Sequence, residues 1–316
     1  HSARASSVAV LRRSAREAPT WVARITGLHR AAQQVAETTR VSVVDRAGLV
    51  RASTRALRGL MEQVPAPRAS EAVRLVGAAE MAGAMSLIAT RMLGQVVPDA
   101  SIGAGAGRSG GEEPGDERTG VVSAEGGRRP SSSPHLLLVA PNVLAMRRQL
   151  DLDMLDLPAW VCLHEMTHAV QLAAAPWLGP YLSDSMRMVI GAVVEAVYGG
   201  PGGGGVADGT GEQGLRRQPG RAARITARAG RGRVLEGLTN FKERSEVASL
   251  AAALTFLEGH AEVVLDDVHP NRMPSVHRLR AVLSRSRAAD AGIGPGPGLG
   301  SLLLHRLMGL EAKEAQ

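Results

Sequence analysis

Two histidines and a glutamate stand close together in the segment VCLHEMTHAVQ, which spans residues 161–171. A helix turns by about 100° per residue, so His164 and His168 would lie one turn apart on the same helix face. Two imidazoles in that arrangement can bind one zinc ion, which keeps an open position in catalytic sites. Glu165 lies beside the first histidine and can take the proton of an attacking water. The spacing therefore predicts zinc as the cofactor, with Glu165 as general base.

The surroundings of the motif favour a metal site over a chance arrangement. Between Val161 and Val170 the only charged residue is Glu165, so we expect a helix that is buried on most sides. Without a metal, two histidines and a glutamate in such a helix would be buried polar groups that need unrelated partners.

A third protein ligand is expected in the segment FLEGHAEVVLDD, which concentrates acidic residues around one histidine. Glu258 continues the apolar series of its helix, where a carboxylate favours a cation, so we predict that Glu258 is this ligand. Glu262 and His260 are the candidates for a residue that orients a ligand, or for an alternative ligand, and His260 could instead donate to a transition-state oxyanion. The competing interpretation is that Thr255, Glu258, Glu262 and Asp266 only form the solvated stripe of an amphipathic helix.

Two predicted helices position these residues. The helix of the motif is predicted to be capped by Asp156, to have Pro158 in its first turn and to end before Pro176, giving about 19 residues. A second long helix is predicted over RSEVASLAAALTFLEGHAEVVLDDV and ends before Pro270.

The N-terminal half predicts more helices and short strands. VSVV is a possible strand, followed by a helix that Asp45 caps. EAVRLVGAAEMAGAMSLIATRMLG is predicted as a long helix ended by Gly94 and Pro98, and HLLLVAP as a short buried strand. The predicted fold class is therefore mainly α with few short strands.

Two stretches, 102–134 and 199–233, depart from a globular composition. The first is rich in Gly, Pro and Ser and the second in Gly and Arg, so neither can offset its ordering entropy by burying apolar surface. We predict two disordered insertions in a single domain over residues 1–316. Because the chain begins at His1 rather than methionine, we also expect its N-terminus to be incomplete, and the family resemblance described below implies the same for its C-terminus.

Charge, cysteine content and hydropathy limit the partners and the cellular location that we expect. The net charge is +7, and seven arginines between residues 216 and 233 equal this excess. No aromatic residue lies among them for base stacking, so a nucleic acid is not the expected partner. The single cysteine, Cys162, excludes an intramolecular disulfide and favours a cytoplasmic location. No unbroken apolar run approaches the roughly 18–20 residues of a membrane span, so no membrane contact is expected either.

Several segments match a known family in the same order along the chain: VVDRAGLVRAS, GAAEMAGAMSLIATRMLGQ, LLLVAPNV, WVCLHEMTHAVQLAAAPWL and LTFLEGHAEVVLD followed by MPSVHRLR. Through them the chain resembles actinobacterial zincin-like proteins regarded as hydrolases and linked to deazaflavin-coenzyme biosynthesis. The resemblance implies a zincin-like helical domain with His164 and His168 as metal ligands and Glu165 as base. Both insertions look foreign to that family.

These observations predict a zinc-dependent, metallopeptidase-like hydrolase that acts on an amide or peptide bond of an unidentified substrate. The alternative is a catalytically silent, zinc-stabilised scaffold or interaction protein that uses the same ligands. A third possibility is an arginine-rich binding protein whose zincin core is vestigial. Glu165 separates the first two, because a structural site has no use for a carboxylate aimed at water. The sequence leaves the oligomeric state open.

Overall fold

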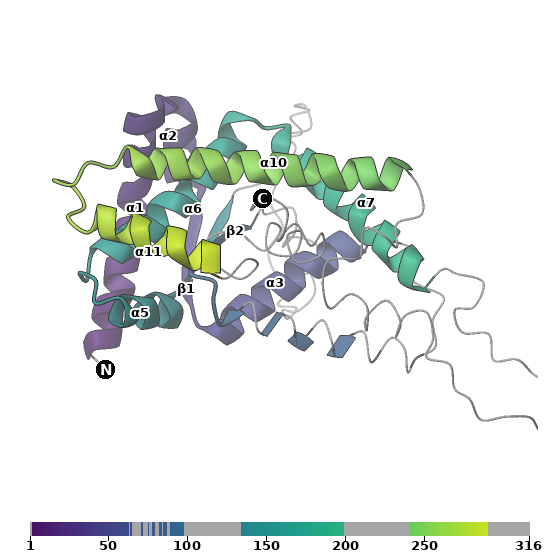
Figure 1. The fold of residues 1–316 in the computed structure, drawn as a ribbon, viewed down its shortest axis with the longest axis horizontal. Helices are drawn as coiled ribbons and strands as arrows, with labels where there is room; N and C mark the ends of the chain where they lie inside the picture. Colours follow the sequence, from purple (N-terminus) through teal and green to yellow (C-terminus); the bar gives the residue numbers. More distant parts are fainter. Residues whose placement is uncertain are drawn as a thin grey trace, which may run out of the picture.

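Helices dominate the computed structural model of the chain (Figure 1), which describes residues 2–62, 89–97, 134–198 and 241–289 and a few positions between 64 and 86. Within these residues only three short strands occur. The mainly helical fold class is therefore confirmed. The predicted insertions lie outside the described residues, apart from Pro134, and so does much of the helix predicted before Gly94.

Eight helices are described in the structure. The cap predicted for α3 is confirmed, since the side chain of Asp45 accepts a hydrogen bond of 2.6 Å from the backbone N–H of Gly48. The described helices are α1 (Ser2–Thr26), α2 (His29–Thr38), α3 (Arg46–Met61), α5 (Ala140–Gln149), α6 (Asp156–Ala174), α7 (Leu178–Tyr198), α10 (Phe241–Asp266) and α11 (Val276–Ala289).

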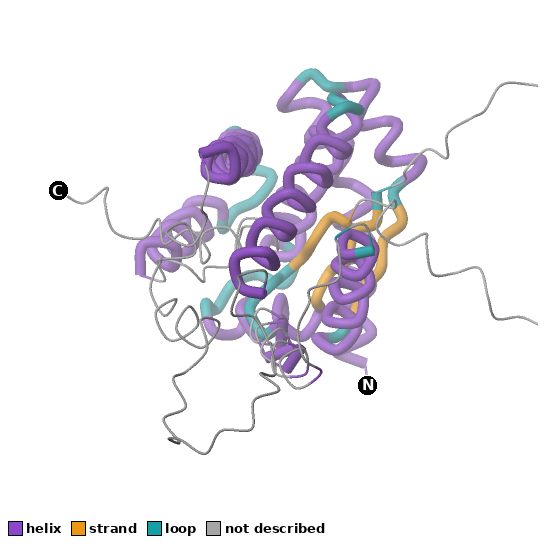
Figure 2. The backbone as a smooth tube through the Cα atoms, turned by 90° about the vertical axis from the view of Figure 1, so that its right-hand side faces the viewer, coloured by secondary structure: helices purple, strands orange, loops and turns teal. Residues whose placement is uncertain are grey.

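A three-stranded sheet lies among these helices (Figure 2). Its strands are β1 (Arg40–Val44), β2 (Gly94–Val97) and β3 (His135–Val139). The central strand β3 pairs in parallel with β1 and antiparallel with β2. β1 and β3 are the two strands that the sequence predicts. β2 is not predicted, because Gly94 and Pro98 in the sequence indicate only the end of a helix.

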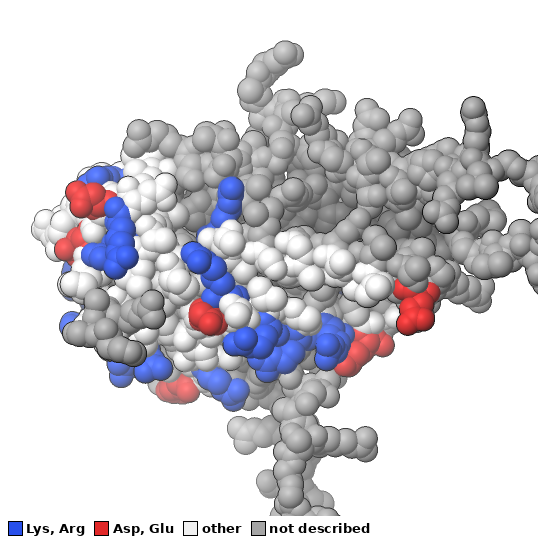
Figure 3. Space-filling view, turned by 90° about the horizontal axis from the view of Figure 1, so that it is seen from below, with Lys and Arg blue, Asp and Glu red and all other residues white. Residues whose placement is uncertain are grey.

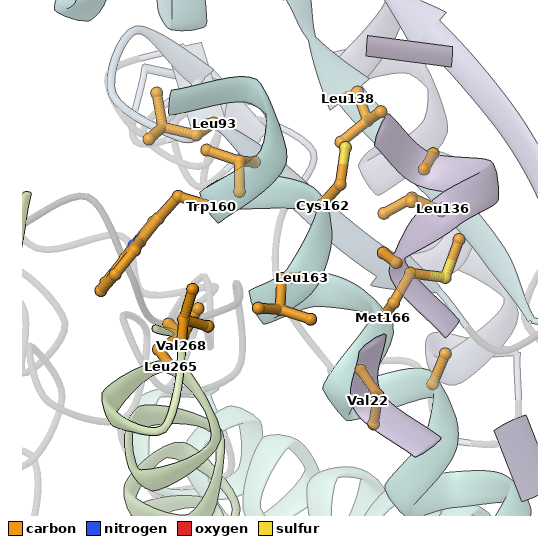
Figure 4. Close-up of a cluster of buried hydrophobic side chains, with 14 of the residues drawn as sticks. Val22, Leu93, Leu136, Leu138, Trp160, Cys162, Leu163, Met166, Leu265 and Val268 are labelled. Atoms are coloured by element: carbon orange, nitrogen blue, oxygen red, sulfur yellow. The ribbon is translucent and has the colours of Figure 1, made fainter. Parts of the chain in front are cut away.

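Helix α6 lies at the centre of the packing. It contacts α1, α2, α10 and the strand β2, and every residue from Trp160 to Thr167 is buried. Figure 4 shows side chains of α6, among them Leu163 and Met166, packed with residues of β3, α1 and the end of α10. Burial raises the pKa of the Cys162 thiol, which favours an inert apolar role for this side chain. The helix is thus buried on most sides, as its sequence predicts.

The cap predicted for α6 is wrong, although the helix has the predicted 19 residues. Its N-cap position is Leu155, and Asp156 is already the first helical residue. The carboxylate of Asp156 instead accepts a hydrogen bond of 2.7 Å from the backbone N–H of Ser275, just before α11. A buried aspartate in a first turn can satisfy a backbone N–H of a distant segment as well as one of its own helix.

Helix α10 is less buried than α6. Phe256 is 73% exposed and Val263 is 60% exposed, on a helix that packs against α6 and α7. Its segment Ser245–Asp266 is long and apolar enough, by length and composition alone, to cross a membrane. A search for unbroken apolar runs overlooks it because Glu258 and Glu262 interrupt the sequence. One such helix does not by itself indicate a membrane protein.

Several arginines of the described helices pair with acidic side chains. Figure 3 shows basic side chains gathered along the face seen from below, with acidic groups beside them. The ion pairs include Arg13 with Glu17 at 2.8 Å and Arg280 with Asp266 at 3.0 Å. Surface pairs of this kind contribute little to stability, because solvent screens them. The arginines between residues 216 and 233 lie outside the described residues.

Candidate metal centre

Three side chains from two helices converge at the edge of the core. His164 and His168 of α6 lie one turn apart, with their Nε2 atoms separated by 3.3 Å. Glu258 of α10 lies opposite them: its Oε2 is 3.4 Å from Nε2 of His164, and its Oε1 is 3.5 Å from Nε2 of His168. Within the described part of the chain, this is the group of histidine, cysteine and acidic side chains that could hold a metal ion.

The separations within this group suit a zinc ion. Nitrogen and oxygen ligands of tetrahedral zinc lie about 2.0–2.2 Å from the metal, so two of them lie about 3.3–3.6 Å from each other. The two Nε2 atoms are 3.3 Å apart, and each has a different oxygen of Glu258 at 3.4 or 3.5 Å. With one ligand atom taken from each residue, the three atoms lie within 4.8 Å of one another. Two imidazoles and one carboxylate are also a donor set that catalytic zinc sites use. The residues present therefore fit the ion that the sequence motif predicts.

Electrostatics in the group favour a bound cation. Burial opposes a charge on His168, but the carboxylate of Glu258 outweighs this effect and raises the pKa of the imidazole to about 9. Burial likewise opposes the charge of Glu258, but hydrogen bonds to the two histidines hold the pKa of this carboxyl well below its usual range. In the absence of a metal, Glu258 is thus an anion that attracts positive charge onto the neighbouring imidazole.

Glu165 is buried directly behind the first histidine. Its carboxylate accepts a hydrogen bond from the backbone N–H of Val96 in β2, and a Cβ added to Gly94 would lie 2.8 Å from its Cγ. Burial raises the pKa of Glu165, and the nearby His164 and His168 only partly counter this effect. A carboxylate beside a zinc site can accept a proton from water and release it again. The short strand β2 therefore shapes the pocket of this carboxylate.

The sequence interpretation does not single out Gln171, which lies next to the group. Its Oε1 is 2.8 Å from Nδ1 of His168, and its Nε2 is 3.0 Å from the carbonyl oxygen of Leu257 and 2.8 Å from Nδ1 of His260. One signal could have found it: Gln171 follows His168 by three residues, so the two side chains lie on the same helix face.

The other two predicted residues lie outside the converging group. The metal-capable cluster contains Glu258 but neither His260 nor Glu262. His260 is two residues further along α10 and contacts Gln171 instead. The described geometry thus brings His164, His168 and Glu258 together, places Glu165 beside them, and joins His260 to them through the amide of Gln171.

Comparisons with known proteins give one matching family. The family model described as zincin-like metallopeptidase matches residues 1–316. The chain is also similar to a crystal structure from Chloroflexus aurantiacus, described as a putative hydrolase with a novel fold. That similarity has a TM-score of 0.44 and 17% sequence identity, and it covers 95% of this chain and 80% of the other. A comparison with curated proteins gave no match.

Proposed function

From the premise that this chain belongs to the zincin-like metallopeptidase family, we propose that it is a zinc-dependent hydrolase that cleaves an amide or peptide bond. The observation that carries the proposal is the convergence of His164, His168 and Glu258, which offer one ligand atom each within 4.8 Å of one another. Such a group supports binding of one zinc ion by two imidazole nitrogens and one carboxylate oxygen.

A bound zinc ion would polarise the substrate carbonyl and make water a stronger nucleophile near neutral pH. The buried carboxylate of Glu165 is assigned to the proton transfers. It takes the proton of the attacking water as the oxygen adds to the carbonyl carbon, and it then delivers that proton to the leaving nitrogen. The raised pKa of Glu165 supports this role, because the carboxyl must hold the proton between the two steps.

The hydrogen bond from Val96 supports the same assignment. A backbone N–H of a strand is a fixed donor, so it holds one orientation of the Glu165 carboxylate without a mobile side chain. A purely structural metal site gains nothing from a buried carboxylate next to its ligands, and burying it has a free-energy cost. The presence of Glu165 therefore favours the hydrolase over the silent zinc-stabilised scaffold.

The test compares the parent protein with Glu165→Gln and His164→Ala. Each protein is assayed for zinc content and for cleavage of a peptide library and of simple amide substrates. We expect about one zinc per chain in the parent and in Glu165→Gln, and much less in His164→Ala. Glu165→Gln should lose about 10²–10⁴-fold in activity, because the amide keeps the shape but cannot act as a base.

Two results would contradict the proposal. Full activity in Glu165→Gln would show that Glu165 is not the general base. Zinc retained in His164→Ala would show that the metal is bound elsewhere. Zinc that is bound and required for thermal stability, with no cleavage of any substrate, would favour the scaffold or interaction protein instead. The link to deazaflavin-coenzyme biosynthesis and the cytoplasmic location rest on the sequence alone and are part of the proposal.

A further inference from the structure

Gln171 contacts two histidines that belong to different helices, His168 of α6 and His260 of α10. We infer that Gln171 is a positioning residue: its amide fixes the tautomers of both imidazoles and fastens α10 to α6 next to Glu258. This inference rests on the proposed function, because it assigns to Gln171 a part in presenting the zinc ligands.

The amide of Gln171 can adopt only one of its two orientations here. One end of the amide lies 3.0 Å from the carbonyl oxygen of Leu257, and a carbonyl oxygen can only accept a hydrogen bond. The amide nitrogen must therefore face Leu257, since the reversed amide would set two acceptor oxygens against each other. This contact places the amide oxygen toward His168.

The amide oxygen determines which nitrogen of His168 carries a proton. It lies 2.8 Å from Nδ1 of the ring and can only accept, so Nδ1 must be the donor. The lone pair of the neutral imidazole is then on Nε2, the nitrogen that lies 3.3 Å from Nε2 of His164 and 3.5 Å from Oε1 of Glu258. Gln171 thus directs the ligating nitrogen of His168 toward the metal position.

The amide nitrogen imposes the opposite tautomer on His260. Its two protons are used by the Leu257 carbonyl and by Nδ1 of His260, which lies 2.8 Å away. Because Nδ1 of His260 accepts this bond, the neutral ring carries its own proton on Nε2. This is the form in which His260 can donate a hydrogen bond through Nε2, as expected of a residue that contacts a substrate oxygen.

The same amide also joins the two ligand-bearing helices. Leu257 directly precedes Glu258 in α10, and the hydrogen bond from Gln171 to its carbonyl connects positions 86 residues apart in the chain. Gln171 is only 8% exposed, so little water is available to replace this bond. The contact therefore fixes the carboxylate ligand relative to the helix that carries both histidines.

The experiment reads the tautomers directly, from ¹H–¹⁵N NMR spectra of the histidine rings. In the zinc-loaded parent we expect His168 to be protonated on Nδ1 and His260 on Nε2, and His260 to show the same tautomer without zinc. In Gln171→Glu, a carboxylate still accepts from His168 but can donate neither to His260 nor to the Leu257 carbonyl, which it repels. We therefore expect His168 to keep its tautomer, His260 to change to the form protonated on Nδ1, and the free energy of unfolding to fall because α10 loses this contact.

Zinc affinity provides the second measurement. Gln171→Ala should raise the Kd for zinc about 10–100-fold, the range typical for loss of a group that orients a metal ligand. Asn142→Ala is the matched control, since Asn142 is also a buried amide and donates to the carbonyls of Ala89 and Met92 at 2.8 and 2.6 Å. The control should lose stability but keep the parent's zinc affinity and tautomers.

Three results would overturn the inference: a parent protein with His260 protonated on Nδ1, unchanged zinc affinity in Gln171→Ala, or equal losses of zinc affinity in Gln171→Ala and Asn142→Ala. If neither variant of Gln171 folds, the spectra of the parent with and without zinc still decide. A parent protein that shows the expected tautomers but cleaves no substrate would support this inference and refute only the hydrolase.

Discussion

Replacing Gly94 with alanine tests the contact between β2 and the buried carboxylate of Glu165. A Cβ at this position would lie 2.8 Å from Cγ of Glu165 and 3.1 Å from its Cδ and Oε1. Carbon atoms in optimal contact lie about 3.5–4.0 Å apart, so the added methyl group must displace Glu165 or the strand. The backbone of Gly94 does not have a positive φ, so alanine is not excluded by conformation. The steric contact with Glu165 should therefore determine how Gly94→Ala changes the free energy of unfolding.

The magnitude follows from two opposing effects on stability. Forcing an extra methyl group into a packed region costs about 1–3 kcal/mol. Alanine also restricts the unfolded chain and thereby stabilises the folded protein by about 0.4–1 kcal/mol. The steric cost exceeds this stabilisation, so we expect Gly94→Ala to lower the free energy of unfolding by about 1–2 kcal/mol. Because the displaced group is the proposed base, activity should fall while the zinc content stays that of the parent.

The assay combines urea unfolding, zinc content and hydrolysis. Gly179→Ala in α7 is the control, since a Cβ there would meet nothing within 4 Å. We expect this control to be at least as stable as the parent, because alanine is the better helix former. If Gly94→Ala is as stable and as active as Gly179→Ala, the strand does not hold Glu165 and the reasoning is refuted.

Three further predictions follow from the site and the chain. The pKa of His168 is about 9, so below that pH zinc must displace a proton from this imidazole. The Kd for zinc, measured by chelator competition, should therefore fall about tenfold per pH unit up to that pH and level off above it. Glu258→Ala should weaken zinc binding at least about 100-fold and His260→Ala less than about tenfold; the reverse ranking would make His260 the ligand. Deleting residues 103–132 and 200–230 should leave the circular dichroism spectrum and zinc content unchanged, because loop closure depends weakly on length; a large loss of thermal stability would contradict this.

Features that repeat along the chain were predictable from sequence. The i, i+4 spacing of His164 and His168 and the apolar residues around them predict a buried helix, and α6 is buried as expected. Asp45 before a helical pattern predicts a cap, and its side chain accepts from Gly48. Both signals depend only on residues that are close in sequence, so they can be recognised without knowledge of the tertiary structure.

Features that depend on distant contacts were missed or misassigned. Strand β2 has four residues, too few for a hydrophobic period, and it pairs with β3 about 40 residues later in the chain. Asp156 has the residue type of a cap, but its partner Ser275 is 119 residues away. The spacing of Gln171 from His168 is local, but only the packing of α10 shows its contacts with Leu257 and His260. Sequence patterns carry no information on which of several possible partners a polar group will find.

The division of the site between α6 and α10 has a topological consequence. An ion held by both helices would act as a crosslink across the interval between His168 and Glu258. The entropy of closing a loop grows only with the logarithm of its length, by about 0.6 kcal/mol for each doubling. Doubling this interval would thus change the affinity for the ion by only about threefold. The Gly- and Arg-rich stretch 199–233 lies inside this interval. A change in its length should therefore have little effect on the affinity for the metal ion.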